Sequence, residues 1–139
     1  MKVDIQQASW PDDKDILSLI RRQVFIEEQK VPEEMEWDEY DTSSVHCLAS
    51  DNGEAIGTGR LMSNGQIGRM AVLKNYRGKG IGTAMLKFLI NQHRSRTNTP
   101  ITIHAQSHAI DFYKNLGFVI NGDEFDEAGI PHVEMILEV

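Results

Sequence analysis

Three glycines and two basic residues are concentrated in one short segment, Arg77-Gly78-Lys79-Gly80-Ile81-Gly82. Glycine has no Cβ atom, so it lets the backbone approach a ligand closely. Apolar residues recur at helical spacing from Ile81 to Leu89, and this pattern predicts that the segment opens a helix. The unpaired N–H groups and partial positive charge of a helix N-terminus favour anions, and Arg77 and Lys79 add full charges. The segment therefore predicts a binding site for a diphosphate.

The spacing of the glycines distinguishes this loop from two common phosphate-binding motifs. A Walker A loop requires a lysine followed by serine or threonine, whereas Lys79 is followed by Gly80. A Rossmann fingerprint requires its third glycine one residue later than Gly82 and an acidic residue about 20 positions on, where residues 97–99 offer none. What remains is the pattern Arg/Gln-x-x-Gly-x-Gly/Ala, which Arg77, Gly80 and Gly82 satisfy.

This pattern resembles the acyl-CoA-binding loop of the GNAT superfamily of N-acyltransferases. Residues 109–118, with the sequence Ala-Ile-Asp-Phe-Tyr-Lys-Asn-Leu-Gly-Phe, are similar to the later motif of that family. Segments 24–32, 68–72, 104–108 and 127–135 look like the ElaA/YjcF-like branch, so the resemblance covers nearly the whole chain. It implies a single acyl-CoA N-acyltransferase domain over residues 1–139, with acetyl-CoA as co-substrate and direct transfer to an amine in a ternary complex.

The resemblance also implies roles for individual residues. Tyr113 matches the general acid that protonates the leaving thiolate, although it could instead be a core aromatic. A backbone N–H of the strand before the loop is expected to polarise the thioester carbonyl, and Phe112 is expected beside the pantetheine arm or in the core. The residues expected to bind acyl-CoA are Met70, Ala71, Val72, Arg77, Gly78, Lys79, Gly80, Ile81, Gly82, Thr83, His108 and Phe112.

The base that would deprotonate the amine is left open by the sequence, because each acid could be a surface charge and each histidine a structural residue. Residues 27–41 are rich in acids, with Lys30 as their only basic residue. With Trp37 and Tyr40 interleaved, this acidic segment is either a pocket for a cationic amine or a solvated loop. The residues considered as base or as acceptor-binding groups are Glu28, Gln29, Glu36, Asp38, Asp41, His104 and His132.

Short elements of alternating type must position these residues. Asn-Gly pairs at 52–53 and 64–65 predict tight turns in an antiparallel meander. A first helix to about residue 28 is expected to bury Ile16, Leu19, Ile20 and Val24. The expected strands are residues 2–6, 45–49, 55–62, 66–72, 100–104, 118–120 and 132–137, and the later helices are residues 81–93 and 109–116, the second capped by Ser107 and ended by Gly117.

This order predicts a mixed α/β fold, with a mostly antiparallel sheet of six to seven strands and about four flanking helices. The net charge of −7 argues against nucleic-acid and anionic-membrane partners. Cys47 is the single cysteine and cannot form an internal disulfide, which fits a reducing, cytoplasmic environment. Cys47 itself is expected to be a small core residue. His104 and His108 are not expected to form a metal pair. We expect the protein to be a monomer or a homodimer. The alternative to an enzyme is a non-catalytic module that senses acyl-CoA.

Overall fold

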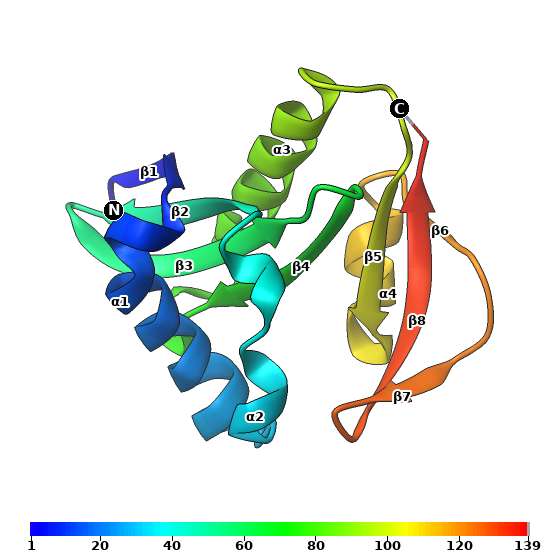
Figure 1. The fold of residues 1–139 in the computed structure, drawn as a ribbon, viewed down its shortest axis with the longest axis horizontal. Coiled ribbons are helices and arrows are strands. Elements are labelled where there is room, and N and C mark those ends of the chain that lie inside the picture. Colours follow the sequence, from blue (N-terminus) through cyan, green and yellow to red (C-terminus); the bar gives the residue numbers. More distant parts are fainter. Residues whose placement is uncertain (139) are drawn as a thin grey trace.

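The computed structural model describes residues 1–138, whose strands form one mixed sheet with the order β1-β2-β3-β4-β5-β8-β6 and with β7 paired to β8 (Figure 1). All neighbouring strands are antiparallel except β4 and β5. The strands are β1 (Val3–Ala8), β2 (Val45–Asp51), β3 (Glu54–Leu61), β4 (Gln66–Val72), β5 (Ile101–Gln106), β6 (Val119–Ile120), β7 (Phe125–Glu127) and β8 (Ile130–Leu137).

Four α-helices and several short helical turns connect these strands. The α-helices are α1 (Trp10–Arg21), α2 (Glu33–Glu36), α3 (Ile81–Arg94) and α4 (Ile110–Lys114). The first helix continues as the π-helical segment η1 (Arg22–Glu28), and the 3₁₀ turns are η2 (Glu39–Asp41), η3 (Lys74–Tyr76) and η4 (Ser107–Ala109). The predicted mixed fold with a mostly antiparallel sheet and about four helices is confirmed.

The Asn-Gly turns predicted from the sequence join the strands of the meander. Asn52 and Gly53 both have positive φ, 49° and 86°, as a two-residue hairpin turn between β2 and β3 requires. The sequence prediction missed β7, whose turn into β8 uses Ala128 and Gly129 at φ 55° and 77°. An Ala-Gly pair is a weaker hairpin signal than Asn-Gly, because alanine has no side-chain oxygen to stabilise a left-handed conformation.

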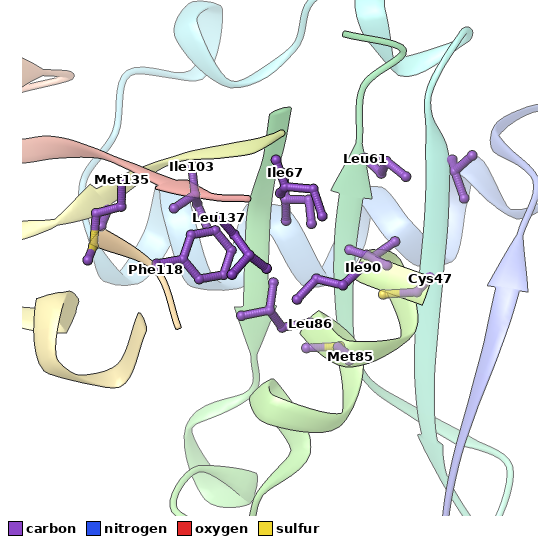
Figure 2. Packing of buried hydrophobic residues seen from close by; sticks show 14 of the residues in the cluster. Cys47, Leu61, Ile67, Met85, Leu86, Ile90, Ile103, Phe118, Met135 and Leu137 are labelled. Carbon is purple, nitrogen blue, oxygen red and sulfur yellow. The ribbon is translucent and has the colours of Figure 1, made fainter. Parts of the chain in front are cut away.

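Helices cover both faces of the sheet. On one face, α3 buries Met85, Leu86 and Leu89 completely, and Figure 2 shows Met85, Leu86 and Ile90 directed at the strands. The same core cluster includes Phe118, next to α4. On the other face, α1 and η1 pack a second, smaller cluster against the sheet, made of Ile20, Val24, Phe25, Val31 and Ala71.

The predicted buried face of α1 is partly wrong. Ile16 and Leu19 are 45% and 65% exposed, whereas Leu17 and Arg21 are fully buried, together with Ile20. The helix is rotated relative to the expectation because Arg21 finds acidic partners from later in the chain. A charged side chain can be buried when it is paired and hydrogen-bonded, and hydrophobic spacing alone does not reveal this.

Strands β4 and β5 pair at only two positions, Gln66↔Thr102 and Ile67↔Ile103. Beyond these pairs the strands diverge, and Figure 1 shows them close together at one end and spread apart at the other. The pairing of β3 with β4 shifts by one residue between Thr58 and Arg60, which marks a β-bulge. The bulge contains Arg69, a non-glycine residue with φ 51°. A bulge bends the strand that carries it, and this one lies in the part of β4 that has no β5 partner.

Candidate functional site

Two cavities open where β4 and β5 diverge. The first, here called the central cavity, has a volume of about 490 Å³ and lies between η1, β4, β5 and the β7–β8 hairpin. The second, here called the loop cavity, has a volume of about 400 Å³ and lies between the glycine loop, α3 and α4. The lining residues that the two cavities share are Met70, Val72, Arg77, Ala109 and Tyr113.

The glycine loop of the loop cavity has the geometry of an anion-binding cradle. Gly78 and Gly80 have φ of 76° and 83°, and a Cβ added to either would meet nothing within 4 Å. Gly80 is the N-cap of α3, so the first N–H groups of this 14-residue helix have no intrahelical acceptor. Open space, bare backbone and a helix N-terminus fit a phosphate group.

The two basic residues of the loop differ in their surroundings. Arg77 donates from Nε to the Val72 carbonyl oxygen at 2.9 Å, and its Nη1 and Nη2 donate to Glu28 at 2.5 and 2.8 Å. Hydrogen bonding to Glu28 raises the pKa of Arg77, and the same bond lowers the pKa of Glu28. Lys79 holds its ammonium 5.9 Å from the centre of the Tyr76 ring. Arg77 therefore joins the loop to η1. Among the ion pairs of residues 1–138, Lys79 has no carboxylate partner comparable to Glu28.

The edge of β4 from Gly68 to Val72 faces the divergence. Among residues 1–138, this stretch has no β5 partner, because the parallel pairing ends at Ile67. Gly68 lines the central cavity, and a Cβ added there would also meet nothing within 4 Å. This edge of β4 can therefore offer backbone groups to a ligand.

Tyr113 lies at the junction of the two cavities. Its ring makes edge-to-face contacts with Phe112 and Phe118, with centroids 5.0 and 5.9 Å apart. Burial raises the pKa of Tyr113 to about 12, so its hydroxyl keeps its proton at neutral pH. Phe112 is 38% exposed and lines only the loop cavity of the two.

The acidic segment is only partly solvated, because two of its acids are buried and one is half-buried. Glu36 and Asp41 are 3% and 2% exposed, and both accept from Arg21, whose Nε and Nη1 lie 2.7 Å from Glu36 Oε2 and Asp41 Oδ1. Trp10 and Trp37 flank this guanidinium, with ring centroids 5.4 and 5.0 Å from Cζ. Trp37 therefore covers an arginine of the protein itself.

Two further arginines complete this buried network. Arg60 Nη1 donates to Asp38 at 2.8 Å and to Asp41 at 2.9 Å. Arg69 approaches Asp38 and Glu36 at 3.3 and 3.4 Å. Because three carboxylates are matched by three guanidinium groups, Glu36, Asp38 and Asp41 carry no excess negative charge for a cationic ligand. The expectation that these acids act together as a free anionic pocket does not agree with this pairing.

A separate cluster of histidines and acids lies at the β5–β8 side of the central cavity. His104 Nδ1 is 3.0 Å from Glu127 Oε1, and His104 Nε2 is 3.8 Å from Glu134 Oε2. His132 Nε2 is 3.7 Å from Glu127 Oε2. Hydrogen bonding to Glu127 raises the pKa of His104, and the same contact lowers the pKa of Glu127.

Gln29, His108 and Cys47, which the sequence analysis also considered, lie at three different places in the structure. Gln29 and Gln106 join η1 to β5 across the central cavity, with Gln106 Nε2 donating to Gln29 Oε1 at 3.0 Å. His108 lines the central cavity rather than the loop cavity. Cys47 is fully buried, as expected, and burial raises the pKa of its thiol to about 12, so it is no thiolate nucleophile.

Three charged residues of the central cavity were missed by the sequence interpretation, namely Arg60, Arg69 and Glu127. Glu127 could have been found from its place before the Ala-Gly turn, since a hairpin brings it close to His132. Neither arginine has a comparable local signal, because their partners lie more than 15 residues away in the sequence.

Among residues 1–138, no helix has the length and apolar character to cross a membrane. No group of three or more His, Cys, Asp or Glu side chains in the same range is arranged to hold a metal ion.

Known proteins are similar to this chain in sequence and in fold. A family model described as an acetyltransferase (GNAT) domain matches residues 7–139. The chain is 40% identical over 126 residues to the uncharacterized protein YyaT of Bacillus subtilis, covering 86% of this chain and 85% of that protein. It is 36% identical over 121 residues to the uncharacterized N-acetyltransferase YjcF of the same organism, covering 84% and 86%.

A solved structure extends the similarity to three dimensions. The crystal structure of an acyl-CoA N-acyltransferase from Pseudomonas aeruginosa is 28% identical and superimposes with a TM-score of 0.87, covering 98% of this chain and 99% of that one. The chain therefore belongs to the GNAT family of acyl-CoA-dependent N-acetyltransferases. The resemblance to the branch that includes YjcF is also confirmed.

Proposed function

We propose that the protein transfers an acetyl group from acetyl-CoA directly to a primary amine, with the cofactor in the loop cavity and the amine in the central cavity. The observation that carries this proposal is the shared wall, in which Met70, Val72 and Tyr113 line both cavities. Two ligands entering from opposite faces of the sheet would meet there. Holding them side by side removes the entropic cost of a bimolecular encounter at the moment of reaction.

The glycine loop would hold the cofactor diphosphate. Gly78 and Gly80 leave open space beside bare backbone, and the N–H groups at the start of α3 point their partial positive charge at it. Lys79 would add a full charge. Bound acetyl-CoA supplies an acyl group activated as a thioester.

Two groups of the shared wall would act during transfer. A backbone N–H of Met70-Ala71-Val72 would donate to the thioester oxygen, because this edge of β4 has no β5 partner. The Tyr113 hydroxyl would give its proton to the departing sulfur, and its raised pKa keeps that proton in place until it is needed.

The central cavity would take a small cationic amine or the end of a peptide. Its volume of about 490 Å³ is in the range of small-molecule sites. Since Glu36, Asp38 and Asp41 are matched by arginines, the carboxylate of the cavity lining that would attract an ammonium is Glu127. Gln29 and His104 would complete the wall around the acceptor.

Thiol release from acetyl-CoA, measured against a panel of mono- and polyamines, amino acids and short peptides, tests this function. We expect amine-dependent release and a mass increase of one acetyl group on the amine. Binding of acetyl-CoA in calorimetry with no thiol release for any amine would instead establish a non-catalytic acyl-CoA sensor.

A further inference from the structure

We propose that His132 is the general base of the reaction, taking the proton of the acceptor ammonium at Nε2, with Glu127 holding the resulting imidazolium. This inference rests on the proposed function and adds the step that the sequence left open. Three observations support it: the position of His132, the tautomer that the Ile130 carbonyl imposes, and the pairing of the acids and of His104 with other partners.

His132 lines the central cavity from β8, although it is only 6% exposed. In the sheet it lies opposite Gln106, so the two side chains are on the same face. Gln106 lies beyond the last paired position of β4 and β5, in the divergent region where the proposed amine must approach the thioester. Phe125 stacks on the imidazole at 6.0 Å between centroids with an interplanar angle of 23°, which restricts rotation of the ring.

The backbone determines which imidazole nitrogen can accept a proton. His132 Nδ1 lies 2.7 Å from the Ile130 carbonyl oxygen, and a carbonyl can only accept a hydrogen bond. Nδ1 must therefore carry hydrogen, so in the neutral ring the lone pair is on Nε2. Nε2 is 3.7 Å from Glu127 Oε2, which exceeds hydrogen-bonding distance and leaves the lone pair available to a ligand or a water in the cavity.

Glu127 is the carboxylate that approaches His132, with its Oε2 3.7 Å from Nε2. Glu127 approaches from β7, and hydrogen bonding from His104 keeps its pKa low, so it is a carboxylate at neutral pH. His104 on β5 lies between Glu127 and Glu134 and has a raised pKa. Arg69 on β4 adds a more distant positive charge that also acts on Glu127. The Glu127 carboxylate, 3.7 Å from Nε2, is close enough to offset the positive charge that the ring gains when Nε2 takes a proton, while the Ile130 carbonyl orients the ring through Nδ1.

The other candidate bases are committed elsewhere. Glu36 and Asp41 are buried against Arg21, and Asp38 is paired with Arg60. Glu28 forms a two-pronged pair with Arg77. His104, the remaining candidate of the sequence analysis, hydrogen-bonds to Glu127 through Nδ1 and has Glu134 3.8 Å from Nε2, so both of its ring nitrogens face carboxylates of the protein.

The protons of the reaction then balance. The ammonium gives one proton to His132 Nε2, and the free amine attacks the thioester carbon. The amine loses its second proton as the N–C bond forms and the C–S bond breaks, while Tyr113 donates to the sulfur and is reprotonated by that second proton. One proton leaves His132 for solvent, and the products are the amide and a neutral thiol.

The test compares His132→Asn with the parent enzyme and the best amine of the panel. Asparagine keeps an N–H near the Nδ1 position for the Ile130 carbonyl but has no nitrogen at the Nε2 position, so the hairpin should stay folded. We expect kcat/KM to fall roughly 10²-fold or more, with the ascending limb of its pH profile lost and the Kd for CoA unchanged. Added imidazole should restore part of the rate.

Glu127→Gln tests the second half of the inference. We expect its ascending limb to move to lower pH, because the imidazolium loses its carboxylate. Asp126→Asn is the matched control, since this exposed neighbour on the same strand lines neither cavity. It should leave the profile where it is in the parent.

An active parent with a His132→Asn profile that still rises through the same pH range would overturn the assignment of the base and leave the proposed function standing. A shift equal for Glu127→Gln and Asp126→Asn would remove Glu127 from the step. A parent that releases no thiol with any amine would refute the proposed function itself, so the two failures are distinguishable.

Discussion

Arg77 and Glu28 form a two-pronged ion pair that joins the glycine loop to the end of η1, with N–O distances of 2.5 and 2.8 Å. The pair spans two proposed binding regions, because the glycine loop lines the loop cavity and η1 borders the central cavity. Arg77 also bonds the Val72 carbonyl oxygen, so its side chain is already held by the protein. Glu28 therefore brings a negative charge close to the proposed diphosphate site.

Neutralising this charge should tighten cofactor binding. We expect Glu28→Gln to lower the Kd for CoA by up to about fivefold at low salt, since an exposed pair is worth up to about 1 kcal/mol, and the gain should shrink as salt is added. Calorimetric titration at two ionic strengths measures this. Glu27→Gln, an equal charge change on an exposed neighbour, is the control. Weaker binding by Glu28→Gln alone would mean that the pair mainly holds the loop in place.

Gly80 should be essential for cofactor binding. CoA and acetyl-CoA are expected to raise the Tm of the parent, because a ligand of the native state stabilises it by mass action. Gly80→Val should abolish this rise by placing a side chain where the diphosphate lies. Gly53→Val is a matched control, since Gly53 has φ 86° against 83° for Gly80 and the same open surroundings.

Both glycine variants carry similar backbone strain, so both should lower the Tm of the free protein. Only Gly53→Val should retain the response to CoA. A folded Gly80→Val protein that responds to CoA like the parent would show that the diphosphate binds elsewhere.

Tyr113→Phe should reduce kcat by roughly 10²- to 10⁴-fold, the range of general acid catalysis, with little change in the Kd for CoA. The ring contacts with Phe112 and Phe118 are kept, so stability should be preserved. Single-turnover rates are the correct measurement, because slow product release could mask the loss. Tyr40→Phe, at an exposed position outside both cavities, should match the parent. A Tyr113→Phe rate within about threefold of the parent, well below that range, would make Tyr113 a packing residue.

Asp41→Asn should destabilise the fold before it affects any substrate. Asp41 is 2% exposed and holds both Arg21 and Arg60, so its neutralisation leaves three guanidinium groups matched by only two carboxylates, Glu36 and Asp38. We expect a loss of about 3–5 kcal/mol in the free energy of unfolding, measured with urea. Glu39→Gln, an exposed acid in the same turn, should change it by less than about 0.5 kcal/mol. Equal effects of the two variants would contradict a structural role for Asp41.

Side chains of increasing size at Gly68 should test whether the amine binds in the central cavity. A side chain there would enter the open central cavity without backbone strain, because Gly68 does not have a positive φ and its Cβ would meet nothing within 4 Å. We expect Gly68→Leu to lower kcat/KM for the amine at least roughly tenfold and to leave the Kd for CoA unchanged. Gly68→Ala should have an intermediate effect. If both variants bind and turn over the amine like the parent, the acceptor enters by another route.

The sequence by itself determined the features that depend on neighbours in the chain. The Asn-Gly turns, the glycine loop with its helix, and Gly117 at the end of α4 all follow from local backbone preferences, and the family resemblance supplied the role expected of Tyr113. These predictions need no knowledge of distant residues. The strands of the meander were found for the same reason, because alternation and turn signals lie within a few positions of each other.

Only the tertiary structure decided which charges are free. The sequence shows an acidic segment, but Arg21, Arg60 and Arg69 reach it from three separate elements and neutralise its buried carboxylates. The tertiary structure likewise places Glu127 beside His132, through an Ala-Gly turn that is only a weak hairpin signal in the sequence. The energy of a charge depends on burial and on partners brought together by folding, so charge spacing along the chain cannot distinguish a structural ion pair from a catalytic group.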